Sequence, residues 1–147
     1  MKTFVSAIVF VLLWAVAGFA SADVNSPAGL WKTIDDKTGK PRGIVLIYEQ
    51  NGQFFGKVEA AIDPKDANQI CDLCKDERKN KPVTGMVILR HLKPDGEAYS
   101  GGDILDPDNG SVYRCKAHLT EGGKKLILRG FIGISLLGRS QTWLRME

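Results

Sequence analysis

The chain has 147 residues and a formal net charge of +3 at pH 7. The first 22 residues contain one charged side chain, Lys2, so the remaining 125 residues (147 − 22) have a net charge of +2. That length is typical of one domain. A charge this small gives no reason to expect a partner such as nucleic acid or an anionic membrane.

The first 22 residues have the features of a secretory signal peptide. Lys2 supplies a positive start, residues 4–20 carry no charge, and Ala20-Ser21-Ala22 forms a small-residue cleavage site before Asp23. An uncleaved membrane anchor is the alternative, because the apolar run is long for a signal peptide. We therefore expect a domain of residues 23–147 that is periplasmic or secreted, without a membrane span of its own.

Short apolar and β-branched runs between turn residues predict eight strands. Asn51-Gly52 is the dipeptide most typical of a two-residue hairpin, Pro94-Asp95-Gly96 is a second turn, and Gly101-Gly102 indicates a bulge. In residues 112–119 apolar and charged side chains alternate, as in a strand buried on one side. The predicted strands are residues 29–34, 44–48, 54–62, 83–92, 98–105, 112–119, 126–131 and 140–146.

Eight short strands with no convincing helix favour an all-β fold, a single antiparallel up-and-down β-barrel. A flat sheet of eight strands would leave two exposed edges, and closure removes them. A barrel of about eight strands is filled by side chains or holds one small ligand. A β-sandwich is the alternative, but only the loop of residues 63–82, between predicted strands 3 and 4, is long enough for its crossing connections. This loop is interpreted as a solvated crossover or a lid.

The stretch from Leu126 to Arg145 is predicted to form the last hairpin and to close the barrel onto the first strand. Glycine within strand-like sequence indicates a bulge, a bend or a close backbone approach. Residues 130–138 are expected to line one mouth of the barrel. Their apolar side chains need cover from the 63–82 loop, a ligand or a partner; they are Ile132, Ile134, Leu136 and Leu137.

Cys71 and Cys74 form a C-x-x-C pair, and an oxidising compartment favours a disulfide between them. Two other interpretations stay open: a redox pair, which lacks a βαβ context here, and half of a zinc site, for which only Cys115, His91 and His118 are left. Cys115 is expected to be a buried free thiol.

No catalytic constellation, phosphate-binding glycine loop or calcium loop is recognised, so neither an enzyme nor a cofactor is predicted. The remaining candidates are aromatic and basic side chains that suit an apolar pocket, with one arginine that binds a carboxylate or another anion. The candidate ligand-binding residues are Tyr48, Tyr99, Tyr113, Phe131, Leu136, Arg139 and Trp143.

Gly29-Leu30-Trp31 is similar to the G-x-W that opens the first strand of lipocalin-like (calycin) barrels. The resemblance implies that Trp31 plugs the closed end of the barrel and that a late arginine, Arg145 or Arg139, covers it. The long C-terminal helix of true lipocalins is missing.

A set of motifs spread over the chain carries a second resemblance: 29–33, 38–41, 47–49, the Cys71/Cys74 loop, 102–107 and 130–133 through Trp143. With these motifs, residues 29–145 resemble a secreted or periplasmic bacterial family known as domain of unknown function 2147, which has no established activity. The resemblance implies a lipocalin-topology barrel. Our leading hypothesis is a barrel that binds a small apolar or amphipathic ligand. The alternatives are an envelope-associated interaction module with a filled barrel and, more weakly, a redox or metal role for Cys71 and Cys74.

Overall fold

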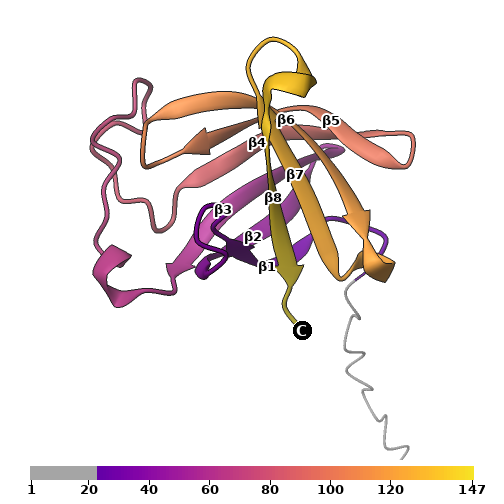
Figure 1. The fold of residues 1–147 in the computed structure, drawn as a ribbon, viewed down its shortest axis with the longest axis horizontal. Coiled ribbons are helices and arrows are strands. Elements are labelled where there is room, and N and C mark those ends of the chain that lie inside the picture. The colour runs from indigo at the N-terminus through magenta and orange to yellow at the C-terminus, as the bar shows by residue number, and fades with distance from the viewer. Residues whose placement is uncertain (1–22) are drawn as a thin grey trace, which may run out of the picture.

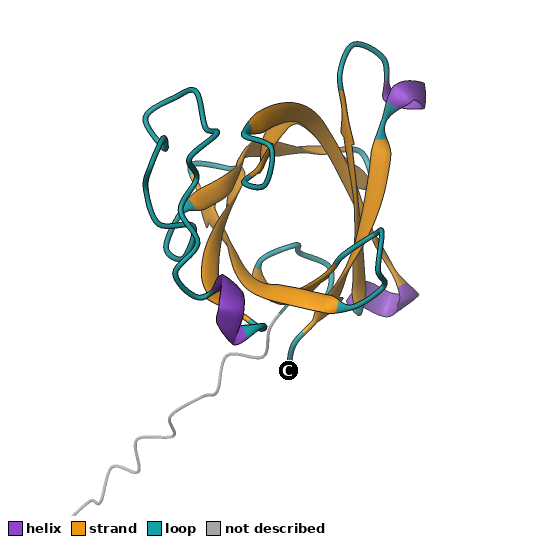
Figure 2. Cartoon of the chain, turned by 60° about the vertical axis from the view of Figure 1, so that its left-hand side comes forward, coloured by secondary structure: helices purple, strands orange, loops and turns teal. Residues whose placement is uncertain are grey.

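Each strand pairs with its neighbours in sequence, and the last strand pairs with the first, so the sheet closes on itself (Figures 1 and 2). The computed structural model describes residues 23–147, and the predicted signal peptide lies outside them. All neighbouring pairs are antiparallel, including β1 with β8, where Trp31 is opposite Arg145. The strands are β1 (Gly29–Ile34), β2 (Pro41–Gln50), β3 (Gln53–Ala61), β4 (Val87–Asp95), β5 (Ala98–Asp106), β6 (Ser111–Thr120), β7 (Lys125–Phe131) and β8 (Arg139–Arg145).

The predicted eight-stranded barrel is confirmed, and seven of the eight strands match their predicted bounds to within three residues. The fourth strand was placed too early, because β4 begins at Val87 and continues to Asp95. Gly85 has a φ of 88°, and the Met86 N–H donates to the Val83 carbonyl oxygen at 3.0 Å, so residues 83–86 form a turn. This conformation interrupts the extended backbone that the apolar residues of the segment suggest.

The predicted turn chemistry is present in the structure. Asn51 and Gly52, between β2 and β3, have φ values of 53° and 75°, as the hairpin requires. The register between β5 and β6 shifts between Tyr99 and Gly102, which is the predicted bulge. Among the described residues the only helices are the short 3₁₀ helices η1 (Pro64–Asp66), η2 (Glu121–Gly123) and η3 (Ser135–Leu137). No helix in residues 23–147 is long and apolar enough to cross a membrane.

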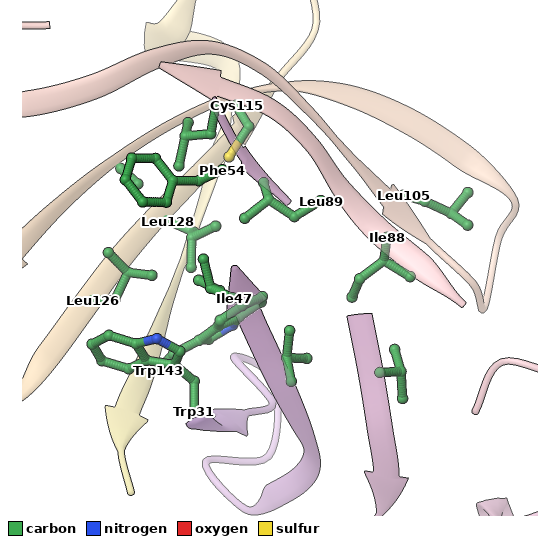
Figure 3. Close-up of a cluster of buried hydrophobic side chains, with 14 of the residues drawn as sticks. Trp31, Ile47, Phe54, Ile88, Leu89, Leu105, Cys115, Leu126, Leu128 and Trp143 are labelled. Carbon is green, nitrogen blue, oxygen red and sulfur yellow. The ribbon is translucent and has the colours of Figure 1, made fainter. Parts of the chain in front are cut away.

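One half of the barrel interior is filled by apolar side chains that point toward one another (Figure 3). These residues come from six of the strands, β1 to β4, β6 and β7, because alternate residues of a strand face the lumen. Burial of this many apolar groups is the main favourable term that holds the barrel together. The filled half contains Trp31, Ile47, Phe54, Leu89, Leu92, Cys115, Ala117 and Leu126.

Trp31 closes this half of the barrel, and Arg145 covers it. The indole ring is fully buried, and its Nε1–H donates to the Pro27 carbonyl oxygen at 2.8 Å. The guanidinium carbon of Arg145 lies 4.3 Å from the centroid of the indole ring, within the range of a cation–π interaction. Arg145, and not Arg139, is therefore the arginine over the plug, and burial lowers its pKa.

Arg145 also ties two separate segments of backbone together at the closed end, the lead-in to β1 and the β6–β7 connection. Its guanidinium donates to the carbonyl oxygens of Ser26 at 2.6 Å, Ala28 at 2.9 Å and Gly123 at 2.7 Å. Gly29 has a φ of 138°, and a Cβ built there would lie 2.8 Å from Nη1 of Arg145. The glycine of the G-x-W pattern thus leaves the space that the arginine occupies.

Replacing Trp31 by Ala is expected to lower the free energy of unfolding by about 3–5 kcal/mol, the usual cost of truncating a buried aromatic side chain. Chemical denaturation followed by circular dichroism measures this loss. Leu30→Ala is the matched control, because Leu30 directly precedes Trp31 in β1 and is 41% exposed. The control should change stability by less than about 0.5 kcal/mol. Equal losses for the two variants would contradict the role of Trp31 as the plug.

Candidate functional site

The other half of the barrel contains a cavity of about 560 Å³. Its opening lies at the end where four connections meet, β1–β2, β3–β4, β5–β6 and β7–β8, because each contributes lining residues. Its volume falls within the range of small-molecule sites, and its depth is apolar. The buried lining residues are Val45, Val58, Ile88, Leu105, Leu128, Phe131 and Trp143.

Strand β8 shows how the wall changes from apolar to polar between the floor and the mouth. Arg139, Gln141 and Trp143 alternate along β8 and all line the cavity. The Trp143 Nε1–H donates to Oε1 of Gln141 at 3.2 Å. The indole therefore has a partner for its one polar atom and presents its apolar surface to the cavity.

Arg139 lies at the mouth and is bound to a carboxylate of the same protein. Its Nε and Nη2 donate to the two oxygens of Asp36 at 2.8 and 2.6 Å, a bidentate pair between β8 and the β1–β2 connection. These hydrogen bonds lower the pKa of Asp36 and raise the pKa of Arg139, so both groups stay charged. The prediction that Arg139 binds an anionic ligand is therefore not supported by its surroundings.

A second bidentate pair crosses the rim between Arg42 of β2 and Asp108 of the β5–β6 turn. Gln69 donates a further hydrogen bond to Asp108 at 3.0 Å. The hydrogen bonds from Arg42 lower the pKa of Asp108, and those to Asp108 raise the pKa of Arg42. Both arginines of the cavity lining are thus neutralised by carboxylates.

Carboxylates outnumber basic groups in the cavity lining. The five acids exceed the three bases by two, a formal charge of −2 if all are ionised. Sequence reasoning missed this rim, because it assigned most of these aspartates to turns and loops. Their common position could have been inferred from the odd-numbered connections of the predicted barrel, which all lie at one end. The charged lining residues are Asp35, Asp36, Asp66, Asp106, Asp108, Lys37, Arg42 and Arg139.

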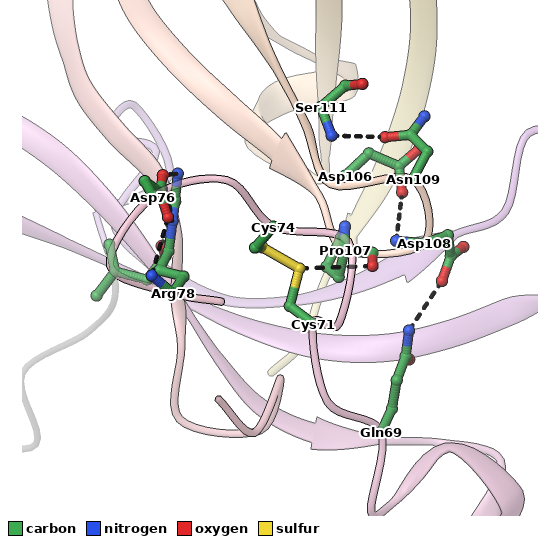
Figure 4. The surroundings of a disulfide bond; sticks show 11 residues. Gln69, Cys71, Cys74, Asp76, Arg78, Asp106, Pro107, Asp108, Asn109 and Ser111 are labelled. Atoms are coloured by element: carbon green, nitrogen blue, oxygen red, sulfur yellow. Dashed lines mark hydrogen bonds and ion pairs between the residues drawn. A yellow bond between two sulfur atoms is a disulfide. The ribbon is translucent and has the colours of Figure 1, made fainter. Parts of the chain in front are cut away.

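A disulfide shapes the β3–β4 connection beside the mouth (Figure 4). Cys71 and Cys74 are bonded and buried, and Cys71 Sγ lies 3.7 Å from the Pro107 carbonyl oxygen. At Gly110, with a φ of 71°, a Cβ would lie 2.0 Å from the carbonyl oxygen of Leu73. The disulfide loop thus packs directly on the β5–β6 turn.

Arg78 anchors the same connection to the barrel. Its side chain is 4% exposed, and its Nη1 donates to the Val87 carbonyl oxygen at 2.9 Å. Nη2 donates to Asp76 at 2.6 Å, and this pairing lowers the pKa of Asp76 to about 2. The connection is therefore a fixed wall of the cavity, to which it contributes Asp66, Gln69, Val83 and Thr84.

The structure divides the predicted ligand-binding residues into two groups. Four of them line the cavity: Tyr113, Phe131, Arg139 and Trp143. Tyr48, Tyr99 and Leu136 do not line this cavity. Tyr48 stacks on Phe55 with ring centroids 5.8 Å apart, and Tyr99 packs edge-on to Phe54 at 5.5 Å, outside the cavity lining.

The β7–β8 connection lies at the mouth, as predicted, and Ile132 and Leu137 line it. The 63–82 loop does not cover this connection, since Ile134 and Leu136 are 59% and 83% exposed. Gly138 brings the backbone close to β7, because a Cβ there would lie 2.3 Å from the Gly130 carbonyl oxygen. The glycines thus allow a close backbone approach, as expected.

Within residues 23–147 no three or more His, Cys, Asp or Glu side chains are grouped so that they could hold a metal ion. Cys115 is a buried free cysteine in the filled half of the barrel. Burial raises its pKa to about 12, which keeps it in the thiol form.

Comparison with known proteins agrees with this architecture. Residues 29–145 match the family described as an uncharacterized protein conserved in bacteria, DUF2147. A solved structure, protein HP1028 from the human pathogen Helicobacter pylori, which is described as belonging to the lipocalin family, is similar with a TM-score of 0.71 and 21% identity. The match covers 82% of each chain. No curated protein matches the chain.

Alkylation of the denatured protein without reductant is expected to label one of its three cysteines, Cys115. In the native protein no cysteine should react, because Cys115 is 1% exposed and the other two are bonded. Mass spectrometry counts the labels, and a sample that is denatured and reduced before alkylation should carry three. Three labels without reductant, in protein isolated from its own cells, would contradict the disulfide.

Proposed function

The chain belongs to the DUF2147 family of bacterial proteins, and we propose that its barrel binds one small apolar or amphipathic molecule. The observation that carries this proposal is the cavity of about 560 Å³ with its apolar depth and polar rim. An apolar group that enters such a cavity leaves water, which is favourable in proportion to the area removed from water. The likeness to HP1028 concerns the fold, so the proposal depends on the cavity.

The rim favours a ligand whose polar end is uncharged or positively charged. Asp36 and Asp108 occupy the donors of Arg139 and Arg42, so an incoming carboxylate would have to displace them. The formal charge of the lining also repels an anion. This replaces the expectation that an arginine fixes a carboxylate.

The proposed location is the periplasm or the exterior of the cell. Two features support it: the signal-peptide-like segment that ends at Ala22, and the Cys71–Cys74 disulfide, a bond typical of oxidising compartments. Both disulfide sulfurs are buried, which supports a structural role over redox exchange with a partner. We assign no catalytic step to the site.

The alternative of an interaction module rests on a different observation. The cavity counts against a filled barrel, but the exposed apolar side chains of the β7–β8 connection favour a surface that meets a partner. Binding inside the barrel and docking by this connection are compatible.

The first test is titration of residues 23–147 with N-phenyl-1-naphthylamine, a neutral apolar dye that fluoresces in apolar sites. The protein should bind one dye molecule. Ala60→Phe should weaken binding at least about tenfold, because the ring fills part of the cavity, and a tenfold change corresponds to about 1.4 kcal/mol. Glu59→Phe is the matched control, since Glu59 is exposed on the same strand and does not line the cavity.

The control variant should bind the dye like the original protein, and both variants should melt cooperatively. Equal binding by Ala60→Phe and the original protein would place the dye outside the cavity and contradict the proposed site.

The second test compares head groups on one alkyl chain. Dodecanol and dodecylammonium should displace the dye at lower concentrations than dodecanoate, by about tenfold or more for dodecylammonium. Asp36→Asn should reduce the difference in affinity between dodecylammonium and dodecanoate, because it removes one carboxylate and releases donors of Arg139. If dodecanoate bound more tightly than the other two amphiphiles, and Arg139→Ala abolished this preference, Arg139 would be an anion-binding residue.

A further inference from the structure

The β7–β8 connection exposes four aliphatic side chains at the mouth of the barrel. Ile132, Ile134, Leu136 and Leu137 are 67%, 59%, 83% and 78% exposed. They lie next to one another in a single short segment that contains the helix η3, and Figure 1 shows this segment beyond the ends of β7 and β8. Single exposed apolar residues are common, but a contiguous group of this kind marks a contact surface.

This segment has a defined shape. Arg129 of β7 donates to the Leu136 carbonyl oxygen at 3.2 Å and to Oγ of Ser140 at 3.1 Å. The Leu137 N–H donates to the carbonyl oxygen of Ile134 at 3.2 Å, and Gly138 packs on the backbone of Gly130. The exposed leucines are therefore held in place at the tip.

The strands that lead to this tip carry only positive charge. The described strands β6, β7 and β8 contain six Lys or Arg residues and no Asp or Glu. Arg139 is paired with Asp36, Lys125 is paired with Glu121, and Arg145 lies at the closed end, so the other three form the basic face near the tip. Close to the tip, Arg114 is opposite Phe131, and Lys116 is opposite Arg129. Two acids face this group: Asp103 of β5 is opposite Arg114, and Asp95 of β4 lines the same surface hollow as Lys116 and Arg129. The outer face of β6 and β7 near the tip is thus basic, although the net charge of the chain is small.

We propose that the β7–β8 connection docks the barrel onto the surface of an anionic lipid bilayer. The aliphatic side chains enter the boundary between head groups and acyl chains, and the basic face of β6 and β7 meets the lipid phosphates. The four exposed aliphatic side chains of one loop tip offer far less area than a stable protein interface buries, which favours lipid over a protein partner or a second copy. The net charge alone gives no reason to expect an anionic membrane, and the proposal rests on the distribution of charge.

Docking in this way brings the cavity to the lipid surface. The acidic rim opposes an anionic surface, so the attraction comes from the aliphatic tip and from the basic outer face of β6 and β7. Ile132 and Leu137 belong both to the exposed tip and to the cavity lining, so the cavity opens beside the docked segment. Given the proposed function, an amphipathic ligand could pass between the bilayer and the cavity without crossing water. The docking itself does not depend on a ligand.

The test is cosedimentation of residues 23–147, which contain all eight strands, with vesicles. One set contains phosphatidylcholine and phosphatidylglycerol in equal parts, and the other phosphatidylcholine alone. The protein should bind the anionic vesicles, and added salt should weaken binding. Ile134→Asp combined with Leu136→Asp should reduce binding at least about tenfold, because two apolar anchors become charged.

Matched variants test whether the loss of vesicle binding is specific to the tip and to the basic face. Leu73→Asp changes another exposed leucine, 54% accessible, and should bind vesicles like the original protein. Lys116→Glu should weaken binding, whereas Lys57→Glu, the same charge reversal on β3, should not. The double variant should keep its melting temperature and its affinity for N-phenyl-1-naphthylamine, since Ile134 and Leu136 do not line the cavity.

Absence of vesicle binding would overturn the proposal, as would equal losses in the double variant and in Leu73→Asp. Dimerisation in sedimentation velocity that disappears in the double variant, without vesicle binding, would assign the tip to a second copy. None of these outcomes affects dye binding, so the cavity proposal is tested separately.

Discussion

The contact between Arg145 and Trp31 decides which end of the barrel is open. A closed sheet of eight strands has two ends, and side chains must fill at least one of them if the lumen is to exclude water. Trp31 fills one end from β1, and Arg145 covers it from β8 while it binds the backbone of Ser26, Ala28 and Gly123. The seam between the first and last strands and the plug are thus stabilised by the same side chain.

Because one end of the barrel is closed, each connection between strands lies either at the closed end or at the open end. The connections after β1, β3, β5 and β7 gather at the other end, where they form the rim of the cavity. The rim is held by ion pairs that join different connections, Asp36 with Arg139 and Asp108 with Arg42. In these pairs the arginines that could have bound an anionic ligand are bound to carboxylates of the protein. The apolar β7–β8 connection lies beside the pairs. The site therefore has an apolar depth, an acidic rim and an aliphatic edge.

Much of the fold could be predicted from sequence because strand alternation and turn chemistry are local. Asn51-Gly52 predicts a hairpin turn, and the alternation of residues 112–119 predicts a strand, without knowledge of which strands pair. The structure confirms both the turn and the strand. The start of β4 could not be predicted this way, since Gly85 takes a positive φ within an apolar run.

The site was predicted less well because its lining depends on which residues of different strands lie at the same level along the barrel axis. Aromatic character alone could not separate Tyr113, which lines the cavity, from Tyr48, which lies outside it. The partner of Arg139 is 103 residues away in sequence, so its ion pair with Asp36 has no local signal. Sequence reasoning did find the exposed mouth segment, because apolar residues in a connection are unusual wherever the connection lies.

The central claim is that the open half of the lumen holds a small molecule in the cell. Native mass spectrometry of the protein isolated from its own envelope or culture medium tests it most directly. The account predicts a complex with one small apolar or amphipathic molecule whose polar end is neutral or cationic, released when the protein is denatured. Protein that carries only its polypeptide mass, and that stays so after incubation with an extract of its own membranes, would contradict the claim.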